Sequence, residues 1–251
     1  MNTSRYAVMA AAIFAFSISA ASADTAKPLR HLEYHFNVGV RGETTVRDSG
    51  IGSGDHSAPG TTGNAPVSGV GTQRTGIADT GTITADFMGM SGDGGAVYVV
   101  NERGRDSRTG EPAQCVVYGN TYLICDQSKT VFDEEIALLR SLGKDFTHAV
   151  PIDAKNHWQY RETTPTSTET TDYTIKNDAG GIVTLAVDDL LTTSGMNAYN
   201  AVGSGTIKYN RTAAVPTSIT MQTISHTKQG SSRGETNLEL TLQNDSLASS
   251  H

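Results

Sequence analysis

Two histidines and a glutamate alternate with apolar residues near the start of the chain, as His31-x-Glu33-x-His35. On a β-strand these side chains would share one face, about 6.8 Å apart between successive Cα atoms. Imidazole and carboxylate ligands suit zinc or another borderline divalent ion, and His157 or His226 would supply further ligands. The alternative is a solvated strand face, where polar side chains belong. A divalent metal at this site is the one cofactor that the sequence suggests, and it would make the protein a metal-dependent enzyme. No other cofactor is predicted.

Other catalytic patterns fail on spacing. The stretch Gly50-Ile-Gly-Ser53-Gly54 lacks the G-x-S-x-G spacing of a nucleophile elbow. The acidic groups Asp133-Glu134-Glu135 and Asp188-Asp189 are better explained by structure, as the start of a helix and the end of a strand. A turn or short helix is expected after the second group. Catalytic residues are therefore unassigned, and the sequence favours a protein that is not an enzyme.

The two cysteines, Cys115 and Cys125, flank a hairpin pattern, CVVY-GNT-YLIC, with Gly119-Asn120 at the turn. A turn centred near Asn120 places them directly opposite each other, and cross-strand neighbours come close enough for a disulfide. The sequence therefore predicts a Cys115–Cys125 bridge.

The N-terminal residues have the pattern of a cleavable secretory signal. Arg5 precedes the apolar stretch Tyr6 to Ala20, and Ala21-Ser22-Ala23 supplies small residues for cleavage. About 15 apolar residues are fewer than the roughly 20 that span a bilayer. We therefore expect residues 1–23 to be removed, with no transmembrane anchor afterwards, and the rest to be exported to the periplasm or the extracellular space.

The charge and composition of the chain bear on which classes of partner it can bind. The formal net charge is −7 at pH 7, and no basic run interleaved with aromatic residues is present. Nucleic acid is therefore not an expected partner.

Period-two alternation dominates the rest of the chain and predicts β-strands. It is clearest where Leu32, Tyr34, Phe36 and Val38 alternate with polar residues, and where Leu238, Leu240 and Leu242 do so near the end. Further strands are expected at 81–90, 96–102, 157–162, 171–177, 181–188, 205–210 and 218–226. Residues 48–80 are rich in Gly, Ser, Thr and Pro. They predict a long flexible loop, either a lid over a site or a tolerated excursion.

One amphipathic helix is predicted at about residues 131–142, capped by Thr130 with Asp133, and its apolar stripe is Phe132, Ile136, Leu139 and Leu142. About ten strands and one helix predict a mainly β fold in a single domain, residues 24–251. We expect a curved antiparallel sheet, half-barrel or barrel-like, with the helix on its concave side. A β-sandwich is the alternative.

The signal, the consecutive long strands, the helical insert and the late stretch Gly205-Thr-Ile-Lys-Tyr209…Val215-Pro216 resemble half-barrel bacterial envelope proteins of the LolA and LppX type. The glycine-rich loop and the cysteine hairpin depart from that pattern. The resemblance implies an apolar concave cavity.

Three functions are therefore carried forward. The first is an envelope protein that binds or carries an apolar or lipid-like ligand, lined by inward residues: Tyr34, Phe36, Val38, Trp158 and Leu240. The second is a structural or adhesive envelope protein with a solid interior and a protein partner. The third is the metal-dependent enzyme.

Overall fold

The computed structural model describes residues 27–47, 70–104, 111–118, 123–143, 156–195, 198–227 and 232–247. These residues form eleven strands and one helix. The strands are β1 (Arg30–Arg47), β2 (Val70–Met90), β3 (Ala96–Gly104), β4 (Ala113–Val117), β5 (Leu123–Cys125), β6 (His157–Thr163), β7 (Ser167–Ala179), β8 (Ile182–Thr193), β9 (Tyr199–Asn210), β10 (Val215–Thr227) and β11 (Ser232–Asp245). The helix α1 (Asp133–Gly143) follows β5. The predicted signal peptide and residues 48–69 of the predicted loop lie outside the described residues.

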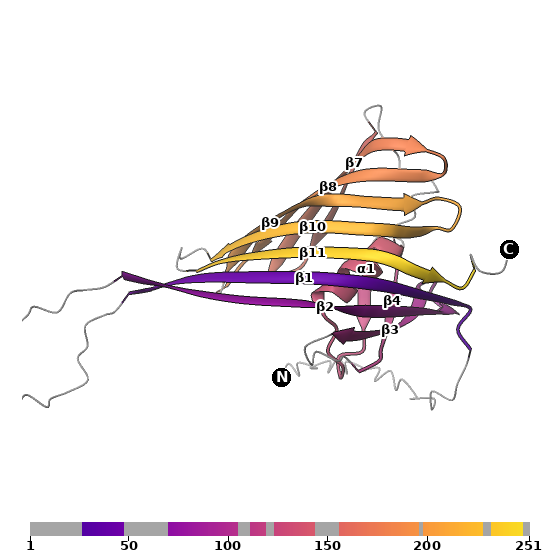
Figure 1. Ribbon diagram of the computed structural model, residues 1–251, viewed down its shortest axis with the longest axis horizontal. Helices are drawn as coiled ribbons and strands as arrows, with labels where there is room; N and C mark the ends of the chain where they lie inside the picture. Colours follow the sequence, from indigo (N-terminus) through magenta and orange to yellow (C-terminus); the bar gives the residue numbers. More distant parts are fainter. Residues whose placement is uncertain are drawn as a thin grey trace, which may run out of the picture.

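The strands form one antiparallel sheet in the order β5-β4-β3-β2-β1-β11-β10-β9-β8-β7-β6. Its central pair joins the first strand to the last, and among the described residues β5 and β6 are its two edges. Figure 1 shows a single curved layer with α1 on one side of it. This confirms the predicted curved antiparallel sheet with one helix, and there is no second sheet in the described residues to make a sandwich.

Alternation along the strands gives the sheet an inner face, towards α1, and an outer face. The core is made by inward side chains of both halves of the sheet together with two leucines of the helix. Its members include Leu32, Tyr34, Phe36, Val38, Ile83, Val100, Cys115, Leu138, Leu139, Trp158, Tyr173, Leu185, Ile207, Ile219 and Leu240. The strict period of two in β1 and β11 therefore identified the buried face correctly.

The position of α1 follows from the topology. The chain must pass from β5 at one edge to β6 at the other, so the connection crosses the inner face. There α1 contacts β3, β4, β10 and β11, and Leu138 and Leu139 are fully buried. The predicted stripe contained Leu139 but omitted Leu138. Within the described residues, no helix is long and apolar enough to cross a membrane.

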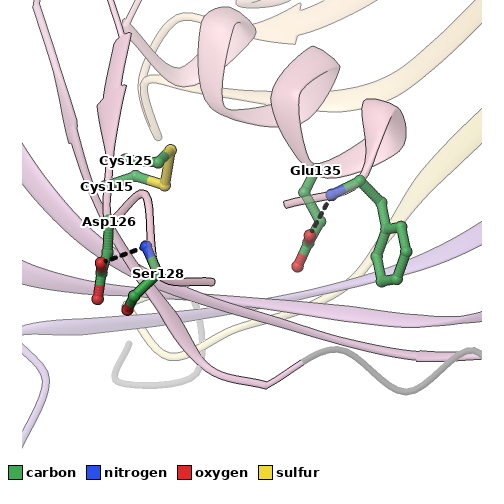
Figure 2. Close-up of a disulfide and its surroundings, with 6 residues drawn as sticks. Cys115, Cys125, Asp126, Ser128 and Glu135 are labelled. Atoms are coloured by element: carbon green, nitrogen blue, oxygen red, sulfur yellow. Dashed lines mark hydrogen bonds between the residues drawn. A yellow bond between two sulfur atoms is a disulfide. The ribbon is translucent and has the colours of Figure 1, made fainter. Parts of the chain in front are cut away.

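The start of α1 differs from the predicted cap. The backbone N–H of Phe132 donates to Glu135 Oε2 at 2.8 Å, and Figure 2 shows the Glu135 side chain turned back to that group. Phe132 is thus the N-cap residue and Glu135 occupies the third helical position, as in half of a capping box. The cap is therefore Phe132 and not the predicted Thr130, and Glu135 takes the role that was expected of Asp133.

The hairpin before the helix contains the predicted disulfide. Cys115 and Cys125 lie directly opposite each other on β4 and β5, with Cα atoms 4.0 Å apart. A turn follows at once, in which the N–H of Ser128 donates to Asp126 Oδ1 at 2.9 Å. Figure 2 shows the bridge and this turn near the start of α1. The covalent hairpin therefore fixes where the chain leaves the sheet edge for the helix.

Two sequence expectations are corrected by long strands. Residues 70–80, which we placed in the flexible loop, are in β2 and pair in register with β1. The expected turn or helix after Asp188 is also absent, because β8 continues to Thr193. In both places the neighbouring strand supplies backbone hydrogen bonds, and these decide the structure where side-chain pattern is weak.

An ion pair fastens the ends of the central strands. Arg30 Nε and Nη2 donate to the two carboxylate oxygens of Asp245 at 3.0 and 2.6 Å. The carboxylate is almost fully buried. A buried charge needs such a two-point partner, so the first residue of β1 and the last of β11 are held together at the core.

Candidate functional site

Strand β9 lacks side chains at two of its inward positions, Gly203 and Gly205. A Cβ atom on Gly205 would lie 2.0 Å from the carbonyl oxygen of Thr220 and 2.5 Å from Met221 Sδ. A Cβ on Gly203 would lie 3.3 Å from Asp189 Cβ. The sheet is therefore thin along β9, and Met221 lies across the space that a side chain would otherwise take.

A groove of about 370 Å³ lies between α1 and strands β7–β11, a size within the range of small-molecule sites. We call it the inner groove. The helix contributes one face, Asp133, Ile136, Ala137, Arg140 and Ser141. The strands contribute Glu169, Thr171, Tyr173, Val187, Asp189, Leu191, Tyr199, Ala201, Ile207, Ile219, Met221, Thr223, Ser225, Thr236 and Leu238. The lining is thus an apolar floor with a few charged groups.

An aromatic cluster supports one wall of the inner groove. The rings of Trp158 and Tyr173 stack with centroids 5.4 Å apart, and Tyr160 meets Tyr173 edge-on at 5.9 Å. Only Tyr173 of the three lines the groove. Because its ring is held on two sides by β6, this wall has a fixed shape.

The other wall, α1, is tied to the sheet by one arginine. Arg140 Nη1 donates to Glu169 Oε1 on β7 at 2.6 Å, and Arg140 Nη2 lies 3.9 Å from Glu162 Oε2 on β6. All three side chains are partly exposed, so solvent screens the pair. The contact nevertheless sets the distance between helix and strands along the groove.

A second, larger hollow of about 890 Å³ lies across β1, β2 and β8–β11. We call it the outer hollow, because its side chains include the outward residues Asn37, Asp188, Ser204, Thr206 and Gln222. Its lining also includes the apolar side chains of Val40, Ile77 and Val187. No helix lines it, whereas α1 forms one wall of the inner groove, so the inner groove is the better small-molecule site.

The five residues predicted to line a cavity are buried members of the core. The exposed fractions are 0% for Tyr34, Phe36 and Leu240, 4% for Val38 and 6% for Trp158. None of them lines the inner groove. The helix α1 and strands β3–β5 cover the part of the inner face that carries these residues.

Burial changes the pKa of two tyrosines, Tyr34 and Tyr98. Burial raises the pKa of Tyr34 far above its usual value, while the nearby Arg30 charge opposes the change. Burial likewise raises the pKa of Tyr98. The Tyr34 hydroxyl donates to the carbonyl oxygen of Pro216 at 2.8 Å. Tyr34 is fully buried, so its hydroxyl has a structural role.

The structure places the suggested metal ligands on the outer face of β1 and gives two of them other neighbours. His31 Nδ1 lies 2.6 Å from Asp86 Oδ1 on β2, and His35 Nε2 lies 3.2 Å from Thr80 Oγ1. His157, named as a further ligand, lies 3.0 Å from Asp172 on the distant β7. In the described part of the chain, no three His, Cys, Asp or Glu side chains are grouped to hold a metal ion.

Sequence reasoning missed the residues that do surround the inner groove. Leu191 lies beyond the predicted end of its strand at residue 188, and Tyr199 precedes the predicted start of its strand at residue 205, so neither was considered. Which side chains of α1 line the groove depends on how the helix crosses the sheet, and no local sequence pattern predicts that crossing.

Comparison with known proteins gives little beyond the fold. No family model matches the chain, and no curated protein matches it. A solved structure described as "lipid-protein interactions in lipovitellin" is similar with a TM-score of 0.46 and 10% identity, over 87% of this chain and 25% of that chain. The chain thus spans about a quarter of that protein's length. A likeness this distant carries no inference about a ligand, and the resemblance to LolA and LppX type proteins stays a prediction.

Proposed function

We propose that the protein binds or carries an apolar or lipid-like ligand in the inner groove. The observation that carries this proposal is the groove itself, about 370 Å³ between α1 and β7–β11. Its floor is formed by Val187, Ile207, Ile219, Met221 and Leu238. Covering an apolar ligand with these side chains removes apolar surface from water on both partners, at about 25 cal/mol per Å².

The location of the protein is part of the same proposal. The signal pattern in residues 1–23 would export the chain to the periplasm or the extracellular space. The Cys115–Cys125 disulfide supports this, because such bridges persist in oxidising compartments. A carrier in an aqueous compartment would shield an apolar ligand from water between two membranes or between a membrane and a protein partner.

The test compares two tryptophan variants of neighbouring residues on β10. Thr223 faces the inner groove, and Gln222 faces the outer hollow. Thr223→Trp fills the groove and is expected to weaken binding of the neutral fluorescent probe N-phenyl-1-naphthylamine at least about tenfold. Gln222→Trp adds the same side chain to the other face and is the matched control.

The outcomes separate the alternatives. Loss of probe binding in Thr223→Trp alone supports the proposal. Loss in Gln222→Trp alone would move the binding site to the outer hollow, and a wild-type protein that binds no probe would reject a carrier altogether. Native mass spectrometry of protein purified without detergent provides a second readout, since a carrier retains a lipid-sized mass.

An outer-face row of apolar residues favours the structural or adhesive alternative. Leu190 and Val202 are directly paired across β8 and β9, and Val202 pairs with Ile224 on β10. Leu190 is 49% exposed and Val202 is 59% exposed. A protein partner on this row would protect it. Leu190→Ser should then abolish capture of that partner without changing probe binding, and an unchanged set of cross-linked envelope proteins would count against this function.

A further inference from the structure

The outer hollow is elongated across the strands. Short runs of neighbouring residues on six strands line it: β8, β9, β10, β11, β1 and β2. These strands are consecutive in the sheet, and neighbouring strands are about 4.8 Å apart, so the hollow is about 24 Å long. A volume of about 890 Å³ spread over that length is a trough. Its shape suits an extended chain molecule.

Two rows of outward side chains form the sides of this trough. The first row, in order of pairing from β8 to β11, is Asp188, Ser204, Gln222 and Asn237. The second row, from β9 to β1, is Thr206, Thr220, Glu239 and Asn37. The rows lie two residues apart along each strand, which separates them by about 6.8 Å. A ligand lying in the trough would therefore meet polar side chains on both sides along most of its length.

The chemistry of the two rows favours a ligand that both donates and accepts hydrogen bonds. Three of the eight side chains are hydroxyls and three are primary amides, and each of these groups can donate as well as accept. The other two are carboxylates, which accept. The hydroxyl groups of a sugar both donate and accept, and they are spaced all along an oligosaccharide.

Two of the amides are held in place by a carboxylate outside the trough. Gln222 Nε2 donates to Glu235 Oε1 at 3.0 Å, and Asn237 Nδ2 donates to the same oxygen at 3.3 Å. The hydrogen bonds from Asn237 and Gln222 lower the pKa of Glu235. Because their nitrogens are engaged, both amides have a fixed direction before any ligand arrives. Less side-chain freedom is then lost on binding.

Other extended ligands fit the trough less well. A peptide strand is commonly bound through its backbone at the edge of a sheet, whereas β8, β9, β10, β11 and β1 are each paired on both sides. A nucleic acid is held mainly by basic side chains, and Arg41 is the one basic residue in the described lining. An oligosaccharide needs neither a free strand edge nor a basic surface.

We propose that the outer hollow binds an oligosaccharide chain, which lies across β8–β11 and β1 with its hydroxyls hydrogen-bonded to the two rows. This site is additional to the proposed carrier function and independent of it, because the trough and the inner groove are on opposite faces of the sheet. In the described lining no aromatic ring is present to stack on a sugar. Hydrogen bonds therefore supply the affinity, and we expect a dissociation constant of about 1 mM for a hexasaccharide.

Saturation-transfer NMR on the full chain tests the proposal. The probes are three hexasaccharides with different linkages (maltohexaose, laminarihexaose and N-acetylchitohexaose), glucose, and an uncharged Gly-Ser peptide of twelve residues. We expect at least one hexasaccharide to bind at least about tenfold more tightly than glucose, because a single sugar contacts only a small part of the trough. The peptide should give no transfer.

A matched pair of variants locates the site. Asn237 belongs to the first row, whereas Asn200 is exposed on the outer face of β9 but does not line the trough. Asn237→Ala removes one amide and should weaken hexasaccharide binding about fivefold. Asn200→Ala makes the same change elsewhere on that face and should leave it unchanged. Neither variant should alter the affinity for N-phenyl-1-naphthylamine.

The outcomes separate this inference from the carrier function. If no hexasaccharide gives saturation transfer up to about 10 mM, the oligosaccharide site is rejected, and probe binding to the inner groove still decides the carrier function on its own. Transfer to the peptide alone would replace the sugar with a peptide ligand and overturn the inference. Equal losses in Asn237→Ala and Asn200→Ala would also overturn it, because binding would then not depend on the trough.

Discussion

The two ends of the inner face are built from the same strands but differ in what covers them. At one end Leu32, Tyr34 and Phe36 are fully buried; this is the filled end, packed against β3 and α1. At the other, the open end, Val40 is 37% exposed and Ile77 is 64% exposed, although they are paired on β1 and β2. The same inward pattern therefore produces a core in one place and accessible apolar surface in the other. The inner groove lies on the same face, over β7–β11.

The contrast shows why an inward residue does not reveal a ligand site. Binding needs an apolar face that is left partly uncovered, and covering is decided by a segment remote in sequence. Here α1 crosses the sheet over the filled end because it must connect β5 to β6.

The largest expected difference is between truncating an aromatic residue at the filled end and one at the groove opening. Phe36→Ala leaves a cavity in a core that is already covered and should lower the free energy of unfolding by about 4 kcal/mol. Tyr199→Ala should cost less than about 1 kcal/mol, because its ring is partly in water, yet it should weaken probe binding. Urea denaturation and probe titration measure the two effects. Equal stability losses would mean that the two ends are equally packed.

A smaller effect is expected from adding a side chain at Gly205 on β9. Gly205→Ala places a Cβ against the Thr220 carbonyl and Met221, so the strands must shift, at a cost of about 2 kcal/mol. Gly39→Ala is the control, because a Cβ there meets nothing within 4 Å, and its stability should change by no more than about 0.5 kcal/mol. Thermal unfolding of both variants checks this. Equal losses of stability in the two variants would show that β9 is not tightly confined by β10.

The smallest effect is a pH dependence that belongs to the filled end. Burial raises the pKa of Tyr34 and of Tyr98. Above about pH 10 the unfolded chain releases these protons while the folded state retains them, so the free energy of unfolding falls as pH rises. Each tyrosine contributes a slope of about 1.4 kcal/mol per pH unit.

The variant Tyr34→Phe isolates this contribution. At neutral pH it should lose about 1 kcal/mol with the hydrogen bond to Pro216, and above about pH 10 its stability should fall less steeply than that of the wild type. Denaturant titrations from about pH 8 to about pH 11.5 measure both. An unchanged alkaline slope would contradict a dry environment for Tyr34.

Much of the fold could be predicted from local pattern. The alternation in residues 31–40 and 236–243 identified inward side chains, and the GNT turn placed Cys115 opposite Cys125, because strand periodicity and hairpin register are short-range properties. Residues 70–80 could not be recognised as strand in this way. They carry little apolar pattern, and their pairing with β1 depends on a partner about thirty residues away.

The sequence by itself determined that the chain is mainly β, that one helix interrupts the strands and which side chains face inward. Only the tertiary structure decided that β1 and β11 meet at the centre of the sheet and that α1 covers one end of its inner face. It also brought Asp189, Arg140 and Tyr199, from three separate elements, to the border of one groove. The physical reason is that a strand or helix pattern specifies a face, whereas burial of that face depends on which remote segment is packed against it.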